Sequence, residues 1–99
     1  MVKLIAPETV IIGEPFTVTF SSESRVAGRL RLTSGTEALP FVLDRGVRLE
    51  ERAPGHRVRG KQGSFQILEW GEPTAGTEIV LRFEGAKAWI KVLASEDEE

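Results

Sequence analysis

The residues of this 99-residue chain that could do chemistry begin with its single histidine, His56, in the run Pro54-Gly55-His56-Arg57. A hydrolytic triad needs a serine or threonine and a carboxylate arranged around a histidine. No serine of this sequence lies in the Gly-x-Ser-x-Gly context of a nucleophile elbow. We therefore interpret His56 as a solvated loop histidine, and we expect no catalytic residue and no enzymatic activity.

The residue types of this sequence do not indicate a metal or cofactor site. The chain has no cysteine, and one histidine cannot complete the usual zinc ligand sets. The run Gly60-Lys61-Gln62-Gly63-Ser64 contains the residue types of a phosphate-binding loop, but its spacing is not that of a P-loop. The acidic run Glu96–Glu99 lacks the preset oxygen cage of a calcium site. We expect no metal and no cofactor.

Basic residues gather in one segment, Arg45–Lys61, which carries a local charge of +4 in a chain whose net charge is −2. Its cations are Arg45, Arg48, Arg52, Arg57, Arg59 and Lys61. Such segregation favours an anionic partner such as a nucleic acid. However, the segment has no aromatic residue on which a base could stack. The alternative is a solvated, mobile loop whose arginines pair with nearby glutamates.

The stretch Thr77–Leu93 predicts a β-hairpin, because Gly85-Ala86 suits a two-residue type II′ turn between alternating sequences. That turn would place Arg82 opposite Trp89 and Val80 opposite Lys91. One face of the hairpin is then entirely apolar, with Ile79, Leu81, Phe83, Ala88, Ile90 and Val92. A hairpin this one-sided needs a second layer to cover its apolar face.

The other face of this hairpin is a candidate protein interface. Trp89 and Arg82 would lie within cation–π distance of each other, and both residue types are enriched at interface hot spots. Leu68 and Trp70 would join them if their strand pairs beside Thr77–Glu84. The predicted interface is Trp89, Arg82, Val80, Leu93, Trp70 and Leu68. Two alternatives are that the predicted loop Glu51–Gly63 covers this patch or that Trp70 faces the core.

Alternation of apolar and polar residues predicts seven to eight short strands and no amphipathic helix. Phe16–Phe20 alternates most strictly, and Val26–Thr33 alternates again with Gly28 on its inward face. The polar run Ser21–Arg25 predicts a loop, and the glycine-rich segment Glu51–Gly63 predicts mostly loop, with a short strand at Val58 left open. Short strands separated by turn signals are typical of an all-β sandwich or barrel.

A resemblance to a known family lies at the start of the chain. Val2–Ile5 and Thr9–Ile12 read as one strand kinked at Pro7. Ala6-Pro7-Glu8, followed by Gly13-Glu14-Pro15 and the strand Phe16–Phe20, resembles the opening of bacterial immunoglobulin-like domains. The resemblance implies an immunoglobulin-like β-sandwich of antiparallel strands and identifies no functional residue. Domains of this kind also occur as accessory domains and as virion decoration subunits.

These observations lead to one functional prediction and one alternative. We expect a single domain over residues 1–94, a disordered acidic tail over residues 95–99, and a cytoplasmic or virion location without a signal peptide or membrane span. The leading prediction is a non-catalytic protein-binding or assembly module whose partner is another protein or a second copy, as in a homo-oligomer. The alternative is a nucleic-acid or polyanion binder that acts through Arg45–Lys61.

Overall fold

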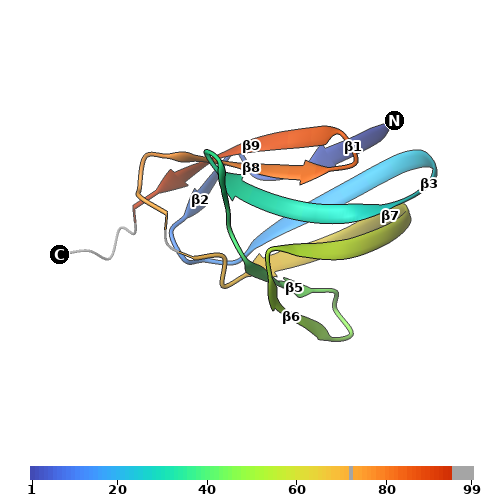
Figure 1. Ribbon diagram of the computed structural model, residues 1–99, viewed down its shortest axis with the longest axis horizontal. Coiled ribbons are helices and arrows are strands. Elements are labelled where there is room, and N and C mark those ends of the chain that lie inside the picture. The colour runs from blue at the N-terminus through green and yellow to red at the C-terminus, as the bar shows by residue number, and fades with distance from the viewer. Residues whose placement is uncertain (72, 95–99) are drawn as a thin grey trace.

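The computed structural model describes residues 1–71 and 73–94, and these residues form strands and turns without a helix (Figure 1). The all-β prediction is confirmed. The predicted acidic tail, residues 95–99, lies outside the described residues. The strands are β1 (Val2–Ile5), β2 (Thr9–Ile11), β3 (Phe16–Ser34), β4 (Glu37–Ala38), β5 (Phe41–Asp44), β6 (Leu49–Ala53), β7 (Gly55–Leu68), β8 (Glu78–Phe83) and β9 (Ala86–Leu93).

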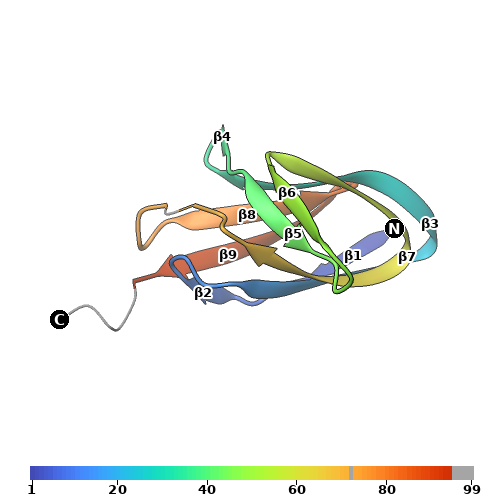
Figure 2. The same ribbon diagram turned by 90° about the horizontal axis from the view of Figure 1, so that it is seen from below.

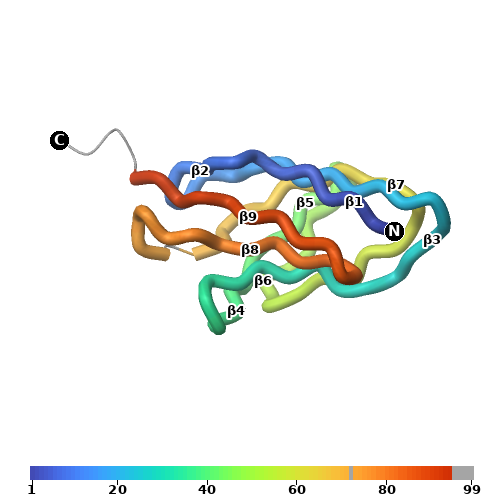
Figure 3. Tube along the Cα trace, turned by 90° about the horizontal axis from the view of Figure 1, so that it is seen from above, coloured from blue at the N-terminus to red at the C-terminus, as the bar shows by residue number. Residues whose placement is uncertain are grey.

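The strands form one curled, mixed sheet in the order β2-β9-β8-β3-β7-β5-β6, with β1 and β4 added along β3 (Figure 2). The predicted break in the first strand at Pro7 is confirmed, since β1 pairs antiparallel with β3 whereas β2 pairs with β9. The pairing of β2 with β9 is parallel, which departs from the purely antiparallel arrangement expected. Figure 3 shows the β1–β2 segment running alongside β9, where it closes one side of the curl.

The curl originates in β3, whose 19 residues belong to both arms of the sheet. Its first part pairs with β1 and with the end of β7, and its last part pairs with β8 and with the start of β7. The β3–β7 register shifts between Ser21 and Val26. The prediction of a loop at Ser21–Arg25 is therefore wrong, because these polar residues form a bulge that bends a continuous strand.

The core lies between the two arms, and it is built from alternate residues of the long strands, as the period-two pattern predicted. Val18 and Phe20 of β3 belong to the same buried cluster as Ile90 and Val92 of β9, and all four are at most 2% exposed. Gly28 lies on the inward side, as expected. Its missing side chain leaves space for the Glu84 side chain, whose Oε2 would lie 1.9 Å from a Cβ at that position.

The β8–β9 hairpin confirms the predicted faces but corrects the predicted register. The turn is Glu84-Gly85, with φ of 49° and 84°, rather than Gly85-Ala86. Positive φ at both central residues is the requirement of a type I′ turn. Val80 therefore lies opposite Trp89, and Arg82 lies opposite Lys87. The register moves by two residues, so every side chain stays on the face that the sequence predicted.

The segment Glu51–Gly63 is not the loop that its glycines and proline suggested. It forms most of β6 and the first nine residues of β7, with Pro54 between the two strands. His56 is 5% exposed, and its Nε2 lies 2.7 Å from the carbonyl oxygen of Phe41. Because a carbonyl oxygen only accepts, Nε2 donates this hydrogen bond. The interpretation of His56 as a solvated loop residue is therefore wrong, and the side chain has a structural role.

Trp70 belongs to the core rather than to the predicted interface. Its side chain is fully buried, its Nε1 donates to the carbonyl oxygen of Glu14 at 2.9 Å, and its ring meets Phe16 edge to face. Leu68 is the last residue of β7 and pairs with Val42 of β5, and β3 separates β7 from β8 in the sheet. Trp70 follows the end of β7. Neither side chain joins Trp89.

The two tryptophans should therefore respond differently to truncation. Trp70→Ala should lower the free energy of unfolding by about 3–5 kcal/mol, because it opens a cavity and orphans the Glu14 carbonyl. Trp89→Ala should change it by less than about 0.5 kcal/mol, because this side chain is 57% exposed. Urea unfolding of both variants measures the difference, and similar losses of stability would contradict the assignment of the core.

Candidate functional site

The outer surface of β7, β3, β8 and β9 gathers six cations that are far apart in the sequence. Alternation places them there, since Arg57 and Arg59 alternate with the buried His56 and Val58 along β7. The same pattern on the other strands directs the remaining cations outward. We call this surface the basic face; it consists of Arg29, Arg31, Arg57, Arg59, Arg82 and Lys87.

Strand register sets these cations directly against one another. Arg29 lies opposite Arg57 across the β3–β7 pair. Arg31 lies opposite Arg82, and Arg82 lies opposite Lys87 across β3, β8 and β9, so these three form one row. Like charges at directly opposed positions destabilise a sheet, typically by a few tenths of a kcal/mol per pair. The free protein therefore carries an unfavourable charge arrangement on this surface.

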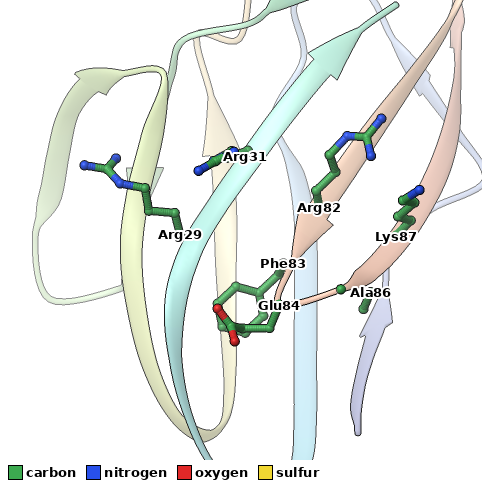
Figure 4. Close-up of a pocket in the computed structure, with 8 residues that line it drawn as sticks. Arg29, Arg31, Arg82, Phe83, Glu84, Ala86 and Lys87 are labelled. Atoms are coloured by element: carbon green, nitrogen blue, oxygen red, sulfur yellow. The ribbon is translucent and has the colours of Figure 1, made fainter. Parts of the chain in front are cut away.

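None of the six cations of the basic face forms an ion pair with a carboxylate of the residues that the structure describes. Among residues 1–71 and 73–94, the ion pairs are those of Arg45 and Arg48 with Glu50, at 3.2 and 3.3 Å. Glu84, in the turn between β8 and β9, lines the same hollow as Arg82 (Figure 4). Its carboxylate occupies the space beside Gly28. The basic face is thus open to an anion from solution.

The side chains in this hollow spread apart. Figure 4 shows Arg29 and Arg31 extending toward β7, whereas Arg82 and Lys87 extend away from them. Gly55 makes room for the first two: a Cβ there would lie 3.1 Å from Nη1 of Arg29. The Nε of Arg82 donates to Oγ1 of Thr33 at 3.3 Å, which uses one donor of its guanidinium group and leaves the two terminal nitrogens. Such an arrangement leaves several guanidinium groups with unused donors.

The predicted basic segment divides into three parts in the structure. Arg57 and Arg59 lie on the basic face. Arg45 and Arg48 line a hollow beside them. The guanidinium group of Arg45 is already engaged, because it forms an ion pair with Glu50, donates from Nη2 to the carbonyl oxygen of Arg57 and lies over the ring of Phe65. The other two lie apart from this group: the Nε of Arg52 donates to the Glu69 carbonyl, and Lys61 is exposed near the bend of β7.

The predicted interface also changes. Trp89 is exposed and Val80 lies beside it, but the predicted contact of Arg82 with Trp89 is wrong because Arg82 lies opposite Lys87. The row that contains Trp89, Val80 and Thr33 adjoins the row of Arg31, Arg82 and Lys87. Leu93 is 37% exposed farther along β9. The two predicted sites, basic and aromatic, therefore meet on one surface.

Sequence reasoning missed Arg29 and Arg31 as site residues, although their outward alternation was visible. They lie outside the segment Arg45–Lys61, and only the pairing of β3 with β7 and β8 places them between Arg57 and Arg82. A search for cations at outward positions of all strands, rather than for a contiguous basic run, would have found them.

The comparisons with known proteins add no assignment: no protein-family model matches this chain, and no curated protein matches it. Residues 1–71 and 73–94 contain no helix of the length and apolarity that crossing a membrane requires. In the same residues, no group of three or more His, Cys, Asp and Glu side chains could hold a metal ion.

The repulsion within the basic face can be tested through stability. Arg31→Gln removes the cation next to Arg82 while keeping a polar side chain of similar shape. We expect the free energy of unfolding to stay constant or to rise by a few tenths of a kcal/mol at low salt. The gain should shrink at high salt, where the charges are screened. Urea unfolding at two salt concentrations measures it. A loss of stability at both concentrations would show that Arg31 makes a net favourable contact.

Proposed function

We propose that this protein is a non-catalytic binding module that recognises a polyanion through the basic face. One observation carries the proposal: the direct opposition of Arg29 with Arg57 and of Arg31 with Arg82 and Lys87. This opposition costs stability in the free protein, and an anion laid across the strands offsets the cost by contacting several cations at once. Net charge alone would not suggest it, because the chain carries −2.

The buried histidine supports a non-catalytic role. His56 is the single histidine of the chain, and its Nε2 is occupied by the Phe41 carbonyl in the core. A general base must reach the proton that it removes, and a ring that is 5% exposed and already hydrogen-bonded does not reach the surface. The basic face itself offers charge and hydrogen-bond donors, which bind anions but do not by themselves break a bond.

The fold we propose for this module is immunoglobulin-like. Two features support this proposal: the first strand is divided at Pro7 between β3 and β9, and the sheet curls so that two arms enclose the core. In such a scaffold the outer surface of either arm is available for a ligand, and the basic face occupies one of them.

Self-association is a second candidate, and we place it away from the basic face. A two-fold dimer through that face would set the same six cations against one another. Strand β6 offers a different surface, since among the described strands it pairs with β5 alone, and Leu49 and the adjoining Val47 are 61% and 90% exposed. An open, partly apolar edge of this kind can pair with a second copy. A virion or accessory subunit would use it in this way.

Polyanion binding has a direct test in heparin affinity. Arg29→Gln/Arg57→Gln should weaken heparin binding at least about tenfold at low salt, because two adjacent contacts are lost. Thr36→Glu/Thr74→Glu is the matched control, since it changes net charge by the same amount in exposed loops outside the face. Titration calorimetry of both variants separates a site from net charge. Equal weakening in both, or no binding by the wild type, would contradict the proposal.

The edge proposal is tested by the mass in solution. Light scattering over a range of protein concentrations should give a mass above 10.9 kDa that falls on dilution. Leu49→Lys places a charge on the open edge and should return the protein to the monomer, whereas Arg31→Gln should leave the mass unchanged. A monomer at every concentration would contradict self-association and leave polyanion binding intact.

A further inference from the structure

We infer that the polyanion is a single-stranded nucleic acid, with Trp89 as the residue on which a base stacks. This inference rests on the proposed function, since it names the ligand of the same basic face. The observation behind it is the position of Trp89, which the fold places on the outer surface of β9 beside the row of Arg31, Arg82 and Lys87.

Trp89 has the exposure and the neighbours that base stacking requires. Its side chain is 57% exposed, whereas the other tryptophan is fully buried in the core. Along β9 it stands between Lys87 and Lys91, each two residues away on the same face and therefore about 7 Å from it. Glu78 lies opposite Lys91, so Lys87 is the less compensated of the two lysines. A large aromatic ring left in water next to cations gains free energy when a flat, apolar surface covers it.

The chemistry of a nucleic acid matches both parts of this surface. Phosphates pair with arginine guanidinium groups, which are open donors in the row next to Trp89. A base supplies the flat surface that covers the indole ring, and such stacking tolerates any base because every base has a π-face. Single-stranded binders combine these two elements, a charged track and stacked aromatic side chains. Polyanions without bases, such as heparin, use only the first element.

The exposed ring of Trp89 favours a single-stranded ligand over a duplex. In a duplex the bases are stacked inside and present their edges in the grooves, so Trp89 would find no free ring surface. The basic face is also the outer surface of a curled sheet, and residues 1–71 and 73–94 contain no helix that could enter a groove. A single strand can lay its phosphates along the arginines and turn one base onto Trp89.

The salt dependence of binding follows from the number of cations. Six contacts, each releasing about 0.7 counterion from a single strand, give a slope of up to about −4 in log affinity against log salt concentration. Arg57→Gln/Arg59→Gln should lower the slope by about 1.4 in magnitude. Trp89→Ala should weaken binding without changing the slope, because stacking releases no counterion. The two parts of the surface thus have separate signatures.

The experiment compares ligands and variants in one titration series. The wild type, Trp89→Phe and Trp89→Ala are titrated with a fluorescein-labelled mixed-sequence DNA oligonucleotide, its RNA counterpart, the DNA duplex and heparin. We expect the wild type to bind the single strands more tightly than the duplex of equal phosphate number. Trp89→Ala should weaken single-strand binding at least about fivefold and heparin binding less than twofold, and Trp89→Phe should retain most of the affinity. The DNA and RNA arms identify which single strand is preferred.

Protection of the indole ring gives an independent readout. Trp89 should be accessible to acrylamide in the free protein and shielded in the single-strand complex, with the buried Trp70 as an unchanging reference in the same spectrum. Urea unfolding of Trp89→Ala confirms that the variant is folded. Two outcomes would overturn the inference and leave polyanion binding standing. One is that Trp89→Ala binds the oligonucleotides and heparin as tightly as the wild type does. The other is that the wild type binds the duplex as well as the single strand. If no polyanion binds the wild type, both proposals are overturned.

Discussion

The antiparallel pairing of β3 with β7, on both sides of one bend, is the interaction on which the rest of this structure depends. The first part of β3 supports β1, and its last part supports β8, while the end of β7 supports β5. The bulge between Ser21 and Val26 changes the direction of the ribbon and turns one sheet into two facing arms. Without the bend, the apolar sides of these strands would have no opposite layer.

Aromatic packing stabilises the bend from inside. Phe20 lies opposite Gly63, and a Cβ at Gly63 would lie 2.9 Å from the rings of both Phe20 and Phe65. The missing side chain lets these two rings stack, with centroids 6.0 Å apart, while Phe20 meets Phe83 edge to face at 5.1 Å. Phe83 belongs to β8, so this cluster ties the ribbon to the hairpin that carries Trp89.

The same ribbon determines the charge of the outer surface. Inward positions of β3 and β7 carry the core, so the alternate positions must face water, and on these strands several of them are arginines. Register then sets the arginines of β3 against those of β7 and β8. A deep core can hold such an unfavourable surface in place, because burial of many apolar side chains outweighs a few tenths of a kcal/mol per charged pair. The opposed arginines can therefore persist on the surface although they lower the stability of the fold.

The sequence by itself determined which side of each strand faces the core. Ile79, Leu81 and Phe83 are buried and Trp89 is exposed, although the predicted register of their hairpin was wrong by two residues. A shift of two leaves every side chain on its face, because the period of a strand is two. Local signals failed where strands continue through polar or glycine-rich residues, at Ser21–Arg25 and Glu51–Gly63.

Only the tertiary structure decided which strands are neighbours. It placed Trp70 in the core and made Arg29, Arg31, Arg57 and Arg82 parts of one surface with Trp89. The physical reason is that alternation in a sequence specifies the side of a strand, which is a local property. The partner across the sheet is chosen by long-range burial and backbone hydrogen bonding, which join residues tens of positions apart in the chain.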